Sequence, residues 1–218
     1  MGIAYNTSIV TNGLVFALDT GNTRSYAGSG STVNSLVEGI GGTLVNGTGF
    51  SSANSGSLFF DGTNDYTDFS TYTPNANTVN IWVRFNSLQN GPIVYVGNDT
   101  YASGSWSWSF FNYGGAFYFR ANSGNLADFY ETPPLATWIN YTLIRDNGSG
   151  QSLAYKNGTF FGTSSNSTLT NSFPNLRFAK AGSTYASFNL SLVHIYNRAL
   201  SAAEISQNFN ATRDRYGI

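Results

Sequence analysis

The spacing of short apolar runs along the chain limits its fold more than any other feature. In residues 79–85 every odd position is apolar, and Trp82 lies on the opposite face with two polar residues. This alternation predicts a half-buried strand of an antiparallel sheet. About a dozen such runs, separated by turn residues, predict an all-β sandwich rather than a βαβ protein. The other runs predicted to be strands are 14–19, 91–97, 105–110, 116–120, 126–130, 138–146, 151–156, 159–161, 175–179 and 188–196.

The stretch Gly56–Phe69 joins two of these runs through a polar corner. Residues 58–60 are apolar on both faces, as expected for a strand enclosed in a core. Residues 61–65 are of types that tolerate turn dihedral angles or bond their own backbone. The pattern predicts a structural hairpin with one strand on each side of a tight turn.

Three segments outside the main β runs are expected to form an arm, an irregular section and a helix. Residues 1–12 are expected to form a short N-terminal arm, and residues 20–43 the longest irregular section. Ser201 and Glu204 have the spacing of a capping box, which predicts a C-terminal helix over about 201–212. Ala202, Ile205 and Phe209 fall on one face of that helix. We expect residues 1–218 to form a single domain.

Composition excludes several classes of function. The 10 Lys and Arg residues are balanced by 11 Asp and Glu residues, which argues against a nucleic-acid partner. The chain has no Cys, so it forms neither a disulfide nor a Cys-ligated metal site. The first twelve residues have neither the pattern of a signal peptide nor that of a membrane span, and no membrane insertion is predicted.

Four segments together resemble the laminin-G-like jelly-roll domains of the concanavalin A-like lectin/glucanase superfamily. The resemblance implies a jelly roll of two curved, stacked antiparallel sheets, with ligands bound at rim loops or on the concave face; the C-terminal helix expected from the capping box completes this fold. Residues 13–30 and 210–217 look like the version found in structural proteins of bacteriophages, notably marine ones. The four segments are Gly56–Tyr66, Val79–Arg84, Trp138–Arg145 with Tyr155–Gly158, and Ile195-Tyr-Asn-Arg-Ala-Leu-Ser-Ala-Ala-Glu-Ile205.

The resemblance also implies a calcium site, from which this chain departs at two positions. Asn34 begins the loop where family members carry an acidic ligand, and Ser191 stands where another Asp often precedes the last strand. Calcium prefers six to eight oxygen ligands with carboxylates among them, so the family site is in doubt here. Asp19, Asp61 and Asp65 are the remaining metal candidates, on a rim, and no cofactor is firmly predicted.

The acidic residues and the histidine do not suggest catalysis. Glycoside hydrolysis needs carboxylates on one strand face, whereas Glu38, Glu131 and Glu204 lie in a loop, before a Pro-Pro break and in a helix cap. His194 is the sole histidine, lies between two apolar residues and is expected to be a packed strand residue with a satisfied ring. With this one histidine and no Cys, the chain has no other residues from which a Ser-His-Asp or Cys-His catalytic group could be built. We therefore predict a protein that is not an enzyme.

The best candidate for ligand binding is the hairpin at residues 105–120. Flat rings beside hydrogen-bonding side chains suit the faces and edges of sugars, which suggests Tyr101, Trp108, Asn112 and Tyr113 as ligand-binding residues. The same rings also suit a core or an oligomer contact, and alternation favours the core for Trp106, Trp108 and Phe110. Tyr113, at the turn, and Tyr101, in the preceding loop, are the rings expected to be exposed.

Resemblance and composition together predict a virion structural protein, a capsid decoration or fibre head on the virion surface. Such a protein is expected to form a homo-oligomer or to bind other virion proteins, and to adhere to host surface glycans. The alternative is a carbohydrate-binding module that is secreted or held at the cell surface.

Overall fold

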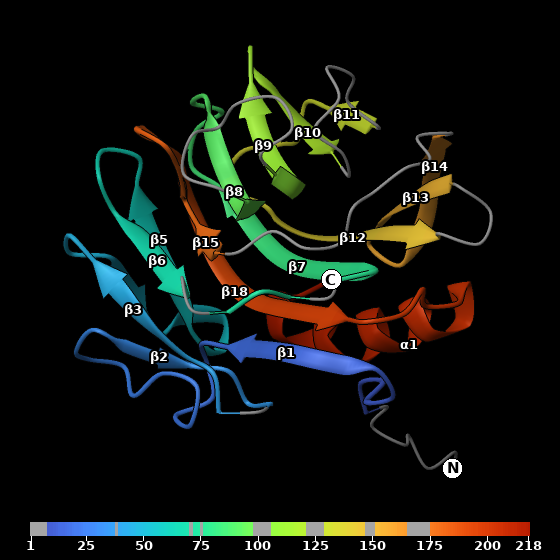
Figure 1. Cartoon of the computed structure of the whole chain (residues 1–218), viewed down its shortest axis with the longest axis horizontal. Helices are drawn as coiled ribbons and strands as arrows, with labels where there is room; N and C mark the ends of the chain where they lie inside the picture. The colour runs from blue at the N-terminus through green and yellow to red at the C-terminus, as the bar shows by residue number, and fades with distance from the viewer. Residues whose placement is uncertain are drawn as a thin grey trace.

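The computed structural model describes residues 8–37, 39–69, 72–74, 76–97, 106–120, 129–146, 151–164 and 175–218. Within them, two eight-stranded antiparallel sheets and one two-stranded sheet are followed by a single α-helix (Figure 1). This arrangement confirms the predicted all-β sandwich with a short C-terminal helix.

Sheet A has the strand order β14–β13–β12–β7–β18–β5–β4, with β1 also paired to β18. Its strands are β1 (Leu14–Asp19), β4 (Gly49–Ser51), β5 (Ser57–Asp61), β7 (Thr78–Phe85), β12 (Trp138–Asp146), β13 (Gln151–Lys156), β14 (Thr159–Ser164) and β18 (Ser187–Tyr196). Sheet B has the order β11–β10–β9–β8–β15–β6–β3–β2. Its strands are β2 (Thr32–Asn34), β3 (Gly41–Val45), β6 (Tyr66–Phe69), β8 (Gly91–Gly97), β9 (Trp106–Tyr113), β10 (Ala116–Arg120), β11 (Phe129–Glu131) and β15 (Leu176–Phe178).

Strand β18 lies at the centre of sheet A. One of its edges pairs with β7 over Phe188–Tyr196, and its other edge pairs first with β5 and then with β1. All its residues after Ser187 are buried. The apolar run predicted at 188–196 is therefore a central strand that is paired along both edges.

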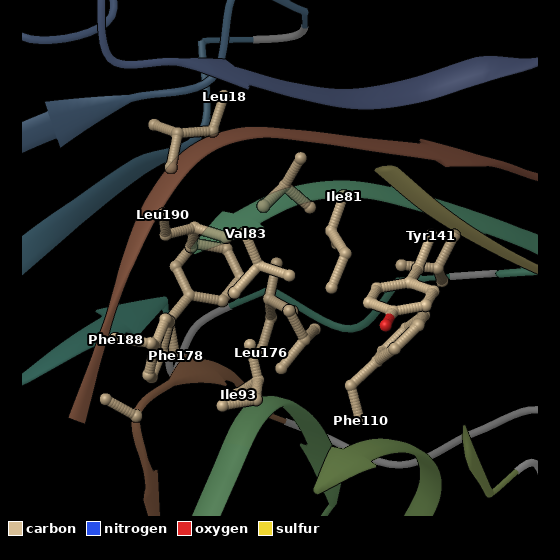
Figure 2. Packing of buried hydrophobic residues seen from close by; sticks show 14 of the residues in the cluster. Leu18, Ile81, Val83, Ile93, Phe110, Tyr141, Leu176, Phe178, Phe188 and Leu190 are labelled. Atoms are coloured by element: carbon tan, nitrogen blue, oxygen red, sulfur yellow. The ribbon is translucent and has the colours of Figure 1, made fainter. Parts of the chain in front are cut away.

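The main hydrophobic core fills the space between the two sheets. Figure 2 shows residues of sheet A meeting residues of sheet B across this space. Several rings make edge contacts there, including Phe85 and Phe117 with centroids 4.9 Å apart. The labelled members are Leu18, Ile81, Val83, Tyr141, Phe188 and Leu190 from sheet A, and Ile93, Phe110, Leu176 and Phe178 from sheet B.

The predicted hairpin at Gly56–Phe69 is wrong. β5 belongs to sheet A and β6 to sheet B, so residues 61–65 carry the chain from one sheet to the other. Asp61 Oδ1 accepts a hydrogen bond from Thr63 N at 2.6 Å, and Gly62 has a φ of +83°. These are turn features that a hairpin and an inter-sheet corner share, so the local sequence does not distinguish the two. Phe59, expected in the core, is 39% exposed.

The C-terminal helix α1 (Ala202–Thr212) follows the predicted capping box. Glu204 N donates to Ser201 Oγ at 3.3 Å, and Ser201 N donates to Glu204 Oε2 at 2.9 Å. The predicted face is only partly right, because Ile205 and Phe209 are buried whereas Ala202 is exposed. A 3₁₀ turn, η2 (Arg213–Tyr216), continues the chain.

Helix α1 and η2 cover the outer face of sheet A, which corrects the prediction of a half-buried β7. Trp82 on that face is fully buried. Its ring stacks on Tyr216 at 3.9 Å and on Phe209 at 5.8 Å, and its Nε1 donates to Thr212 Oγ1 at 2.9 Å. An alternating strand is half-buried only if one of its faces meets solvent. Here the C-terminal segment covers that face, so β7 is buried on both sides.

The remaining local predictions have mixed outcomes. The hairpins β9–β10 and β12–β13 form as expected. The section at 20–43, expected to be irregular, contains β2 and part of β3. Part of the N-terminal arm is fixed to the helix, since Val10 N donates to Asn208 Oδ1 at 2.8 Å. No helix in the described ranges is both long and apolar enough to span a bilayer.

Candidate functional site

The outer face of sheet B carries a group of aromatic side chains near its β11 edge. In β10, Phe117 and Phe119 belong to the core, so alternation turns Tyr118 outward. In β11, Phe129 belongs to the core and Tyr130 points outward by the same argument. Strand β9 contributes Phe111 and Tyr113 on the outer side of core residue Phe110. We name Phe111, Tyr113, Tyr118 and Tyr130 the tyrosine patch.

Strand register places the rings of the patch side by side. Tyr118 pairs with Phe111 on one neighbouring strand and with Tyr130 on the other. The Tyr118 and Tyr130 rings are stacked, with centroids 5.6 Å apart, and Phe111 stacks on Tyr113 at 6.3 Å. Tyr130 is 68% exposed and Tyr113 is 56% exposed. In the patch, Tyr118 and Phe111 thus support the exposed rings of Tyr130 and Tyr113, which are open to a ligand.

Further along the same face, the surface is less open. Arg177 Nε lies 3.3 Å from Asp68 Oδ1, and Tyr95 is fully buried against Ala181. Ala181 belongs to a small hairpin of β16 (Lys180–Ala181) and β17 (Thr184–Tyr185) that contacts β8. Within the described part of sheet B, this hairpin covers the middle of the outer face, whereas Tyr113 and Tyr130 of the tyrosine patch remain exposed.

The chemistry of the patch suits an uncharged, partly apolar ligand. A ring face offers apolar area, and each tyrosine adds a hydroxyl that donates or accepts a hydrogen bond. The nearby carboxylate of Glu131 is engaged elsewhere, since it accepts from the Tyr141 hydroxyl and lies 2.7 Å from Lys156 Nζ. Burial and this carboxylate raise the pKa of Tyr141 above its ordinary value, so the phenol stays protonated.

The predicted ligand-binding residues occupy different environments. Tyr113 is exposed in the patch, and the adjacent turn is fixed by a 2.8 Å hydrogen bond from Gly114 N to Asn90 Oδ1. Asn112 is fully buried, and neither of its amide atoms has a hydrogen-bond partner. Trp108 lies in β9 opposite Val96 of β8, and Tyr101 falls outside the described residues.

Sequence reasoning missed Tyr118 and Tyr130. Both alternate with core phenylalanines. The period-2 alternation in 116–120 and 129–131 could therefore have predicted that these two tyrosines face outward. Their proximity depends on the pairing of β10 with β11, which the sequence pattern does not specify.

The candidate metal ligands are engaged with protein groups. Both carboxylate oxygens of Asp19 lie 3.0 Å from nitrogens of the Arg215 guanidinium. Asp65 Oδ2 accepts from Asp61 N at 3.4 Å, and burial raises the pKa of Asp65. Ser191 Oγ donates to Gly56 O and accepts from the Tyr216 hydroxyl. In the ranges that the structure describes, no three His, Cys, Asp or Glu side chains form a group able to hold a metal ion.

His194 is a packed residue of β18, as predicted. Only 3% of it is exposed, and burial lowers its pKa to about 4, so the ring is neutral at pH 7. The expectation of a satisfied ring is wrong at one atom, because Nδ1 has no hydrogen-bond partner. The local sequence shows the apolar neighbours of His194 in the chain but not what faces its ring across the fold.

Solved structures share this fold at low sequence identity. A Trypanosoma rangeli sialidase in complex with sialic acid matches with a TM-score of 0.70 and 17% identity, over 95% of this chain and 34% of the sialidase. The receptor-binding domain of botulinum neurotoxin type G gives 0.67 and 16%, over 91% of this chain and 51% of that domain. This chain therefore spans about a third of the sialidase and half of the toxin domain.

One match is a domain of similar size. Domain 4 of AbnA, an extracellular arabinanase from Geobacillus stearothermophilus, was solved in complex with arabinotriose. It matches with a TM-score of 0.71 and 14% identity, over 89% of this chain and 97% of that domain. At such identities these likenesses show a shared fold. A search of curated proteins found no match.

A family model extends the likeness from fold to sequence. The Laminin_G_3 model, described as concanavalin A-like lectin/glucanases superfamily, matches residues 61–206. This range runs from the end of β5 into helix α1 and covers more than half of the chain. The chain therefore belongs to the Laminin_G_3 family of the concanavalin A-like lectin/glucanase superfamily.

Proposed function

We propose that this protein is a non-catalytic, single-domain carbohydrate-binding module whose glycan lies on the tyrosine patch. The observation that carries the proposal is the stacked Tyr118–Tyr130 pair, which holds a ring that is 68% exposed on an open part of sheet B. A protein of the same fold, domain 4 of AbnA, was solved with an arabinose oligosaccharide, which supports a glycan as the ligand.

The patch favours sugars that present an apolar face. Separate sugar rings of one oligosaccharide, with their C–H groups on Tyr130 and on Tyr113, would bury those faces, while their hydroxyls reach the phenol oxygens and water. The two open rings are held by Tyr118 and Phe111, so little conformational freedom is lost on binding. Neutral oligosaccharides are therefore the proposed ligand class.

Replacement of either exposed tyrosine is expected to weaken glycan binding. Tyr130→Ala and Tyr113→Ala should each raise the dissociation constant about tenfold, which corresponds to roughly 1.4 kcal/mol for one lost ring contact. The measurement is a glycan array followed by calorimetric titration of the best neutral oligosaccharide, with and without calcium. We expect the same affinity in both conditions, because Asp19 is paired with Arg215.

Phe160→Ala is the matched control. Phe160 lies on β14 of sheet A and is 55% exposed, close to the exposure of Tyr113. Its replacement should leave glycan affinity unchanged. An equal loss of binding in Phe160→Ala, or a wild-type protein that binds none of the glycans, would contradict the proposed site.

We further propose that the module works on a virion surface, as a capsid decoration or fibre head. The resemblance of residues 13–30 and 210–217 to phage structural proteins supports this setting. A secreted or cell-surface module is the alternative. Light scattering on the purified chain should give a fixed oligomer, as expected for a symmetric virion component. A monomer at all concentrations would favour the alternative.

A further inference from the structure

A polar cavity of about 270 Å³ lies on the outer face of sheet A, beside the C-terminal segment. Its wall follows from strand alternation, because the side chains that line it neighbour core residues in the sequence and therefore point outward. It belongs to the other sheet from the tyrosine patch, so it forms a separate site. The polar residues of its wall are Ser51, Asn54, Ser57, Arg84 and Asn189, and Trp138 adds an aromatic ring.

Arg84 lies in the middle of this wall, because its neighbours on both adjacent strands also line the cavity. It pairs with Asn189 on β18 and with Trp138 on β12. Directly opposed residues of antiparallel strands have Cβ atoms about 4.5–5.5 Å apart. Asn189 Nδ2 in turn donates to Ser57 Oγ at 3.3 Å. Register and this hydrogen bond therefore place the four side chains next to one another on one surface.

A chain of hydrogen bonds holds the charged end of Arg84 beside the cavity. Arg84 Nη1 donates to Asn86 Oδ1 at 3.1 Å, and Asn86 Nδ2 donates to Asn189 Oδ1 at 3.0 Å. The guanidinium head, and not only its aliphatic stem, thus lies one amide group away from a residue of the cavity wall. Because its only partner here is a neutral amide, the charge of the guanidinium stays uncompensated.

The other nitrogens of Arg84 remain free to bind a ligand. Across the described ranges, Nε and Nη2 have no hydrogen-bond partner, and the side chain forms no ion pair. The residue is partly exposed, and neither nitrogen is among the buried atoms that lack a partner. Both N–H groups are therefore accessible to solvent and can donate to an acceptor that enters from outside.

The charged groups nearest to this wall do not supply a counter-ion. Asn54 Nδ2 donates to the backbone oxygen of Arg215, whose guanidinium is paired with both oxygens of Asp19. Asp61 shares the outward face of β5 with Ser57 but lies four residues further on, about 13 Å along the strand. Within the part of the chain that the structure describes, a monoanion is therefore the charge that the cavity lacks.

We propose that this cavity binds a small hydroxylated carboxylic acid, such as a uronic acid, with its carboxylate on Arg84. A planar guanidinium matches the two oxygens of a carboxylate in a way that a point charge does not. Elsewhere in the wall, Ser51 Oγ accepts from Ala53 N at 3.3 Å and keeps its own hydrogen to donate to a ligand hydroxyl. The volume is just below that of pockets for drug-sized ligands, which suits a single sugar ring. This site is independent of the proposed glycan site.

The test compares three probes on the unaltered protein. D-glucuronate is titrated beside D-glucuronamide, which has the same ring with a neutral amide, and beside inorganic phosphate, an anion without a ring. The readout is the indole N–H signal of Trp138, one of four tryptophans, in a ¹H–¹⁵N spectrum, assigned with Trp138→Phe. Trp138 Nε1 donates to Asn54 Oδ1 at 3.1 Å in the cavity wall, so this signal should report on binding. We expect a saturable shift with glucuronate and at least tenfold weaker binding of the other two probes.

Arg84→Gln and a matched control provide the second measurement. Arg84→Gln removes the charge, so the shift caused by glucuronate should be lost while circular dichroism stays unchanged. Lys180→Gln removes a positive charge from β16, over the other sheet, and should bind glucuronate like the wild type. The probe comparison needs no variant, so it holds even if Arg84→Gln does not fold. No saturable shift in the wild type, equal binding of the three probes, a shift retained in a folded Arg84→Gln, or an equal loss in Lys180→Gln would each overturn the proposal.

Discussion

Trp82→Ala is expected to lower the free energy of unfolding by about 3–5 kcal/mol, the range for removing a large aromatic side chain from a core. Trp82 is fully buried between sheet A and the C-terminal segment, where it stacks on Tyr216 and Phe209. The substitution also leaves Thr212 Oγ1 without the indole N–H that donates to it. Urea unfolding followed by circular dichroism measures the change.

Two variants separate this effect from a general loss of aromatic area. Trp82→Phe keeps a ring against Tyr216 and should cost less than Trp82→Ala. Tyr113→Ala removes a ring that is 56% exposed, and should change stability by less than about 1 kcal/mol. If Trp82→Ala were no more destabilising than Tyr113→Ala, the helix would not be held to sheet A by this stack.

The stability of the protein is expected to fall by roughly 3 kcal/mol between pH 7 and pH 4 because of His194 alone. Burial lowers its pKa from 6.5 to about 4, with a smaller opposing effect of Asp19 and a further lowering by Arg215. Between these two values the unfolded chain binds a proton that the folded chain excludes. The stabilisation is therefore complete above pH 6.5 and is lost as the pH falls toward 4.

His194→Phe tests this linkage. The variant keeps a ring in the buried position but cannot take up a proton. Between pH 7 and pH 4 its unfolding free energy should therefore fall by roughly 3 kcal/mol less than that of the wild type. Glu204, whose pKa is lowered to about 2 by Arg198, begins to lose its stabilising contribution as the pH falls below about 4.5, but it does so equally in the wild type and the variant and cancels in the comparison. Equal pH dependence in wild type and His194→Phe would contradict the assignment to His194.

Local features of the fold followed from the sequence. The capping box of Ser201 and Glu204 and the β9–β10 hairpin each depend on residues close together in the chain, and both form as expected. The prediction of a hairpin at 61–65 was wrong because it depended on residues far apart in the chain. Its turn residues are compatible with either a hairpin or an inter-sheet crossing, and the choice depends on which distant strands pair with β5 and β6.

The candidate sites show the same division. The exposure of Tyr113 was predicted from its place at a turn tip. Tyr130 could be recognised as part of the same patch only from the pairing of β11 with β10. The pairing of Asp19 with Arg215 was not expected, because only the docking of the C-terminal segment brings these two residues together.

The all-β class, the positions of most strands and the terminal helix could all be predicted from the sequence. Alternation and capping are local properties, since each residue needs only its near neighbours to adopt an extended or a helical backbone. Three features became visible only in the folded structure: α1 covers sheet A, Trp82 is buried, and Tyr113 and Tyr130 are exposed on sheet B. These outcomes depend on contacts between residues far apart in the chain, such as Trp82 with Tyr216 and Tyr118 with Tyr130, through which apolar area leaves water.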